Sequence, residues 1–225
     1  MTLKLHLSID FLHKLYDDVF KINDEVCGYL QMSDDKLTMY NKKKGERDEK
    51  GRGSCSLPEK IAGSQTDYIF HTHPENSYAY PSFQDLWYVM KRRNVYSFIM
   101  TIWGLFVVVP RGTIAINDEK TRDDYEKIFK YNITEFHKNT KRGSHVSKSY
   151  NDSISEITHF INIVNKLFGE KRRRSKSPTR SSPKRSRSND DQIDSLGCHL
   201  YMYLYSWEDI ACEKVNKKKF IEIET

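Results

Sequence analysis

The stretch Tyr68-Ile-Phe-His-Thr-His-Pro74 decides how the rest of this chain is interpreted. Its three bulky leading residues are bounded by polar residues and a proline, which predicts a short buried strand. His71 and His73 stand two residues apart, so a strand would place both imidazoles on one face of a sheet. Pro74 has no N–H to donate and is expected to end the strand.

A helix start is predicted a few residues later, in Pro81-Ser-Phe-Gln-Asp85. Ser82 is the expected N-cap with Asp85 three residues on, and an apolar run follows at Leu86, Trp87, Val89 and Met90. Two imidazoles at a strand end and a carboxylate in the first turn of the next helix can converge on one point. Such a set of nitrogen and oxygen ligands is typical of catalytic zinc, whose fourth position holds water.

Each part of this pattern also has a simpler explanation. A His-x-His pair on a strand is often unrelated to metal binding, and Ser82 with Asp85 alone would form an ordinary capping box. Glu25, taken alone, would be an exposed charge near the end of a helix. The metal-site interpretation therefore depends on the parts occurring together.

Together, His71-x-His73-Pro74, Ser82-x-x-Asp85 and Glu25 in Glu25-Val-Cys-Gly-Tyr-Leu30 resemble the signature of the JAB1/MPN/Mov34 (JAMM) metalloproteases. The resemblance is most specific over Glu25 and residues 69–86, and it extends over residues 5–140. It departs from the family at one point, because eleven residues separate His73 from Asp85 where ten are usual. The extra residue falls in the loop at 75–80, and a loop absorbs one residue at little cost.

The resemblance implies an α/β fold, with a central mixed β-sheet flanked by helices, of the MPN type that is similar to cytidine deaminases. It implies that His71, His73 and Asp85 hold Zn²⁺, that Glu25 transfers protons without binding the metal, and that Ser82 stabilises the oxyanion. The implied activity is that of a zinc metallopeptidase, a deubiquitinase-like hydrolase of isopeptide or peptide bonds. Ubiquitin or ubiquitin-like conjugates are the implied partners.

The rest of the chain alternates between periodic segments and polar connections. We expect helices over 8–20, 118–138 and 152–168, and strands over 25–32, 37–40, 95–102, 105–109, 200–205 and 220–223. Residues 41–66 are predicted to be a mobile loop with one helical turn near Pro58–Ala62. The expected organisation is a catalytic domain over 1–140, a helical extension over 141–169, a disordered Arg/Ser-rich segment over 170–192, and a strand-rich segment over 193–225 that can rejoin the first domain.

The basic residues are concentrated in residues 171–188, which hold nine Lys or Arg and no acidic residue. Removing those nine from the 37 basic residues leaves 28 against 31 acidic ones, a net charge of −3 for the remainder. Such a segment can bind nucleic acid or an acidic protein surface, act as a nuclear import signal, or only tether. Its RS and SP dipeptides are sites at which phosphorylation would reverse the charge.

Composition also excludes several classes of protein. No apolar run reaches the roughly 18–20 residues of a membrane span, and the first residues lack the pattern of a signal peptide. The four cysteines form no C-x-x-C pair, so we expect reduced thiols in an intracellular protein, cytoplasmic or nuclear. A zinc deaminase would need a Pro-Cys-x-x-Cys pair, which this sequence lacks.

Two alternatives to an enzyme stay open at this stage. One is a catalytically silent MPN scaffold that binds a partner protein, and the other is a nucleic-acid-associated protein that acts through residues 171–188. Silent members of the family usually lack a ligand or the glutamate, whereas this chain has Glu25 and all three ligand candidates. The sequence does not indicate which modifier or linkage is cleaved, or the oligomeric state.

Overall fold

The structure is a computed structural model of the 225-residue chain. It describes residues 4–21, 24–47, 49, 53–60, 62–74, 80–92, 94–111, 118–139, 150–169, 200–207, 210 and 220–224. Compact packing divides the chain into two units. We call Met1–Pro110 with Met202–Thr225 the sheet unit, and Arg111–Tyr201 the helical unit.

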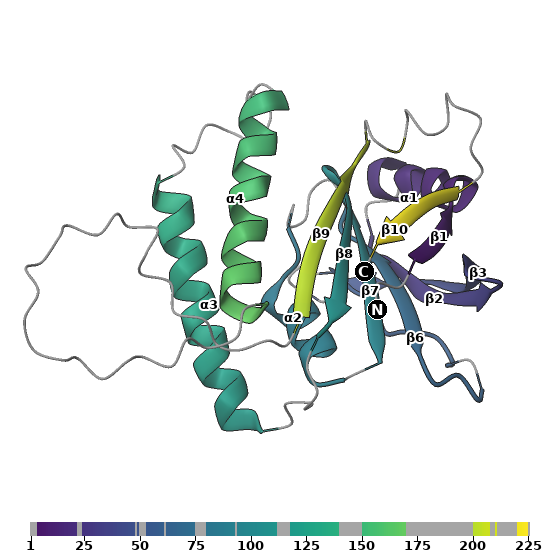
Figure 1. Cartoon of the computed structure of the whole chain (residues 1–225), viewed down its shortest axis with the longest axis horizontal. Coiled ribbons are helices and arrows are strands. Elements are labelled where there is room, and N and C mark those ends of the chain that lie inside the picture. Colours follow the sequence, from purple (N-terminus) through teal and green to yellow (C-terminus); the bar gives the residue numbers. More distant parts are fainter. Residues whose placement is uncertain are drawn as a thin grey trace, which may run out of the picture. The chain divides into compact units, whose positions relative to one another are not determined.

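A mixed β-sheet forms the body of the sheet unit (Figure 1). Its strands are β1 (Lys4–Ser8), β2 (Val26–Ser33), β3 (Lys36–Lys44), β6 (Asp67–Thr72), β7 (Val95–Thr101), β8 (Gly104–Pro110), β9 (Leu200–Ser206) and β10 (Phe220–Glu224). They lie in the order β10-β1-β3-β2-β6-β7-β8-β9. β1 with β3 and β6 with β7 are parallel pairs, whereas β1 with β10, β2 with β3, β2 with β6 and β7 with β8 are antiparallel. A separate two-stranded ribbon joins β4 (Glu46–Arg47) to β5 (Gly53–Ser54).

Helices α1 (Ile9–Lys21) and α2 (Phe83–Met90) belong to the sheet unit, and α3 (Glu119–Asn139) and α4 (Tyr150–Phe168) to the helical unit. α1 forms because its apolar residues recur at helical spacing, and Ser8 Oγ accepts a hydrogen bond from Phe11 N at 3.4 Å at its start. In the helical unit, the aromatic rings of Tyr125 and Phe129 in α3 lie near that of Phe168 in α4. Within the described ranges, no helix combines the length and the apolar character that crossing a membrane requires.

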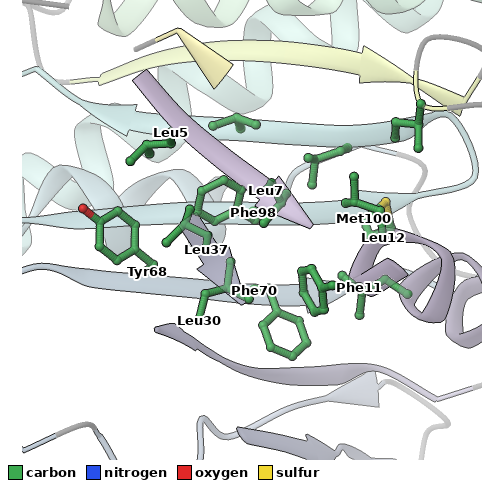
Figure 2. Close-up of a cluster of buried hydrophobic side chains, with 14 of the residues drawn as sticks. Leu5, Leu7, Phe11, Leu12, Leu30, Leu37, Tyr68, Phe70, Phe98 and Met100 are labelled. Carbon is green, nitrogen blue, oxygen red and sulfur yellow. The ribbon is translucent and has the colours of Figure 1, made fainter. Parts of the chain in front are cut away.

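One face of the sheet packs against α1 and forms a hydrophobic core (Figure 2). Alternate residues of the central strands point into it, among them Leu30 of β2, Phe70 of β6 and Phe98 of β7. α1 contributes Phe11 and Leu12, and the ring of Phe11 packs edge-on against Phe70 at 5.1 Å between centroids. Because Tyr68 and Phe70 of β6 point into this core, the alternate residues of β6 face the opposite side of the sheet.

The opposite face carries the intervening residues of the same strands. Ile69 and Ile99 are buried there, and α2 contacts β7 and β8 with its own buried residues Leu86 and Val89. The helices α1 and α2 therefore cover opposite faces of one mixed sheet. This confirms the predicted α/β class with helices flanking a mixed sheet.

The structure confirms most of the predicted elements and corrects several others. β1, β4 and β5 were not predicted, and β3 continues to Lys44 beyond its predicted end. The described residues 58–60 are not helical, so the turn predicted near Pro58 is wrong there. Residues 200–205 and 220–223 do form strands, and both strands join the main sheet. The segment 170–192, predicted to be disordered, lies outside the described residues.

The cysteine prediction is wrong for two of the four residues. Cys27 and Cys55 form a disulfide, with their Cα atoms 5.9 Å apart. Their separation of 28 residues carries no motif, and only the folding of residues 45–60 brings Cys55 to β2. Cys198 and Cys212 lie outside the described residues.

Candidate metal centre

The two histidines lie at the end of β6, where the strand leaves the sheet. Tyr68 and Phe70 point into the α1 core, so strand alternation turns His71 to the α2 face. His73 follows directly after β6, and its backbone N donates to Met100 O at 2.7 Å, which continues the pairing with β7 by one residue. The predicted placement of both imidazoles on one face is therefore what the backbone produces.

Asp85 reaches this point from the first turn of α2. Ser82 is the N-cap, and both hydrogen bonds of a capping box are present. Ser82 Oγ accepts from Asp85 N at 3.3 Å, and Asp85 Oδ2 accepts from Ser82 N at 2.6 Å. Because one carboxylate oxygen is held by the helix start, the orientation of the whole group is fixed.

Potential ligand atoms of three residues converge between the strand end and the helix start. His71 Nε2 lies 3.1 Å from His73 Nε2 and 3.2 Å from Asp85 Oδ1, and His73 Nε2 lies 3.5 Å from Asp85 Oδ2. The side chain of His73 is 6% exposed, and those of His71 and Asp85 are each 16% exposed. The group is therefore largely withdrawn from water but still open to the surface.

These distances fit a tetrahedral metal ion. Zinc ligands at about 2.0–2.1 Å from the metal lie about 3.3–3.4 Å from one another in a tetrahedron. The separations of His71 Nε2 from His73 Nε2 and from Asp85 Oδ1, 3.1 and 3.2 Å, lie close to that value, and His73 Nε2 lies 3.5 Å from the other carboxylate oxygen, Oδ2. Two unprotonated imidazole nitrogens and a carboxylate are all acceptors, so they approach this closely only around a proton or a cation. His71, His73 and Asp85 could therefore hold a metal ion.

The electrostatics of the group favour an ionised carboxylate. Burial opposes the charged form of Asp85, but the charge and hydrogen bonds of His71, together with those of His73, outweigh that effect. They hold the pKa of Asp85 well below its usual range. The N-terminus of α2 also favours a negative charge in its first turn. Asp85 is therefore available as an anionic ligand at neutral pH.

Glu25 lies just before β2, the strand that pairs with β6. The antiparallel ladder of β2 and β6 ends where Cys27 pairs with His71, and Glu25 is two residues before Cys27. Glu25 does not belong to the group of ligand atoms within 4.8 Å of one another, which among the described residues contains His71, His73 and Asp85. The role of Glu25 as a carboxylate that transfers protons without binding the metal stays a prediction.

Two supports of the site were not predicted from the sequence. Thr72, buried between the two histidines, points to the opposite face, where its Oγ1 accepts from Val26 N at 2.9 Å. The disulfide of Cys27 starts directly beside His71 in the ladder. A polar residue within a buried strand was a usable signal for Thr72, whereas no local pattern marks the disulfide.

The basic segment 171–188 lies outside the described residues, so its predicted contact with nucleic acid stays a prediction. Comparison of the chain with family models, with curated proteins and with solved structures gave no match.

Proposed function

We propose that this chain is a zinc-dependent isopeptidase or peptidase of the JAMM type, acting on ubiquitin or ubiquitin-like conjugates. The observation that carries the proposal is the convergence of His71, His73 and Asp85 at separations of 3.1 to 3.5 Å. The mixed sheet with a helix on either face agrees with the MPN fold that the motif implies. The choice of zinc rests on the nitrogen and oxygen donor set and on the tetrahedral spacing.

The bound ion would supply Lewis-acid activation of water and leave one position open for it. In this proposal, the Glu25 carboxylate accepts a proton from the attacking water and passes it to the leaving amine. Its place two residues before Cys27, the ladder partner of His71, and outside the ligand group suits a residue that must exchange protons without being held by the metal.

Ser82 contributes a hydroxyl next to the same point. Ser82 Oγ accepts from Asp85 N, and a hydroxyl that accepts one hydrogen bond still has its own proton to donate. In the proposed mechanism that proton stabilises the oxyanion of the tetrahedral intermediate. The capping role and the catalytic role are compatible because they use different parts of the same group.

The test is metal analysis of the purified protein together with turnover of a panel of ubiquitin dimers. We expect about one zinc per chain and cleavage of at least one linkage. Glu25→Gln should keep the metal and lose turnover, whereas His73→Ala should lose both. A protein that binds no metal would overturn the proposal, and one that binds zinc but cleaves no conjugate would favour the silent scaffold.

A further inference from the structure

The disulfide of Cys27 and Cys55 starts next to the candidate metal ligands. Cys27 and His71 are directly paired in the antiparallel ladder, so their side chains lie on one face, with Cβ atoms about 4.5–5.5 Å apart. Cys55 follows β5 directly. The disulfide therefore links the strand beside the metal group to the ribbon of β4 and β5.

Close backbone contacts continue from this disulfide to Glu25. Gly45 N donates to Glu25 O at 2.7 Å. A Cβ added to Gly45 would lie 2.5 Å from Ser54 O and 3.0 Å from Glu25 O, so Gly45 is packed between those two backbone groups. Ser54 precedes Cys55, which returns to Cys27, two residues after Glu25. Covalent bonds and close contacts thus form a closed circuit through Glu25.

A second support reaches Glu25 from the other side. Val26, the residue after Glu25, donates its N–H to Thr72 Oγ1 between the two histidines. The backbone of Glu25 is therefore fixed toward β6 by Thr72 and toward β5 by Gly45. Ser54, which packs against Gly45, is held by the disulfide of the adjacent Cys55 and by its ladder pairing with Glu46. None of the three metal ligands belongs to this support.

We propose that Cys27 and Cys55 are positioning residues for Glu25, so that opening their disulfide lowers turnover while the metal group is kept. This inference rests on the proposed function of Glu25. A dithiol opens the disulfide by exchange: its thiolate attacks one sulfur, the S–S bond breaks, and the other cysteine leaves as a thiolate. The second thiol of the reductant then closes a cyclic disulfide, and two protein thiols result.

The experiment compares oxidised wild type, wild type treated with dithiothreitol that is then removed, and Cys55→Ser. Metal content, kcat and KM on a cleavable ubiquitin dimer are measured for each. We expect kcat to fall about 10–100-fold, the loss that a small misplacement of a reacting group causes, with KM and metal content nearly unchanged. Reoxidation should restore kcat in wild type and have no effect in Cys55→Ser.

Two further variants separate the positioning of Glu25 from general loosening of the segment. Gly45→Ala must displace Ser54 or Glu25, so it should lower kcat with the disulfide intact. Lys60→Met removes the ion pair of Lys60 Nζ with Asp67 Oδ2 at 2.9 Å, at the far end of the segment that begins with β5. This control should leave kcat unchanged. An unchanged kcat after reduction of wild type would overturn the inference.

If wild type binds zinc but cleaves no conjugate, the proposed function fails. Hydrogen exchange then tests separately whether the disulfide fixes the backbone at Glu25. Reduction should then speed exchange of the Gly45 amide, which is bonded to Glu25 O, and leave the His73 amide, bonded to Met100 O, as it was. Equal protection of the Gly45 amide in both redox states would overturn the structural part of the inference.

Discussion

A single carboxylate, that of Asp85, connects the start of a helix to the candidate metal group. Asp85 Oδ2 is held by the Ser82 N–H, and Asp85 Oδ1 faces His71. Groups that hydrogen-bond to a metal ligand and fix its orientation commonly contribute to metal affinity. From the sequence, Asp85 could belong to an ordinary capping box or bind a metal, and the geometry permits it to do both at once.

Replacing Ser82 with alanine separates these roles, because the Ser82→Ala variant keeps the backbone N–H that holds Asp85. We expect unchanged metal content, a loss of about 1 kcal/mol in the free energy of unfolding from the missing cap, and turnover reduced about 10²–10³-fold from the missing oxyanion donor. Denaturant unfolding, metal analysis and steady-state kinetics measure the three quantities.

Ser8→Ala is the matched control, since Ser8 Oγ accepts from Phe11 N at the start of α1. It removes a helix cap of the sheet unit without altering Ser82. If Ser82→Ala changes turnover no more than Ser8→Ala does, Ser82 only caps α2.

Tyr68 should make the free energy of unfolding fall at alkaline pH. Burial, followed by the neighbouring Tyr96 and Asp35, raises the pKa of Tyr68 from 10.0 to about 12. The neutral phenol is therefore favoured in the folded state. The resulting stabilisation, about 2–3 kcal/mol, is fully present below pH 10 and is lost as the pH rises through about 12.

The prediction is tested by unfolding wild type and Tyr68→Phe at a series of pH values from neutral to 12. Wild type should lose more stability across the alkaline range than Tyr68→Phe, which lacks the ionising group. Tyr131→Phe, at a residue that is 67% exposed, serves as the control and should follow wild type. Parallel curves for wild type and Tyr68→Phe would contradict the assignment.

At the level of elements, α1 is joined to β3 by an ion pair whose carboxylate is buried and whose lysine is partly exposed. Lys42 Nζ lies 2.7 Å from Asp18 Oδ2, and the Asp18 side chain is 7% exposed. We expect Lys42→Met to lower the free energy of unfolding by about 3 kcal/mol, because it leaves a buried carboxylate without its cation. Denaturant unfolding at neutral pH measures the loss.

Lys21 and Asp17 provide the comparison on the same helix, since their side chains are 71% and 56% exposed. Lys21→Met should change stability by less than about 0.5 kcal/mol. Asp18→Leu combined with Lys42→Met should recover most of the loss, as an apolar pair in place of a buried ion pair often does. Equal effects of the two lysine substitutions would contradict this account.

The elements also show how far a sequence predicts a fold. α1, α2 and the hairpin of β7 and β8 were predictable, because each repeats its pattern within a few residues. β1, β4 and β5 were missed because short strands depend on partners distant in the chain. β3 also carries an extra residue, Tyr40, between the partners of Tyr29 and Leu30, and no local pattern predicted this shift in register.

Gly28 shows how a neighbouring strand can restrict the residue type at a position. A Cβ there would lie 2.0 Å from Asn41 O and 2.8 Å from the Phe70 ring, so β2 and β3 approach too closely for any side chain. The same limit applies to the candidate site. Its three ligands were predictable from spacing within 15 residues of sequence, His71 to Asp85, whereas the disulfide and the Thr72 contact depend on how β2 is placed beside β6.

At the scale of the whole sheet unit, the metal group joins two separate elements, β6 and α2. A metal that binds only the folded state should therefore stabilise it, by about 2.7 kcal/mol at a free concentration 100 times its Kd. Thermal unfolding with added zinc or with a chelator measures the effect. His71→Ala should abolish the response, and a response that survives His71→Ala would assign the stabilisation to another site.

The pairing of β1 with β10 has a consequence for how the protein matures. Lys4 is paired with Glu224, so one border of the sheet joins residues that are 220 positions apart in the sequence. During synthesis that border cannot form until residues 220–224 have left the ribosome, and one edge of β1 lacks its neighbour until then. Such distant pairing is slow to form, so we expect this border of the sheet to be completed late in folding.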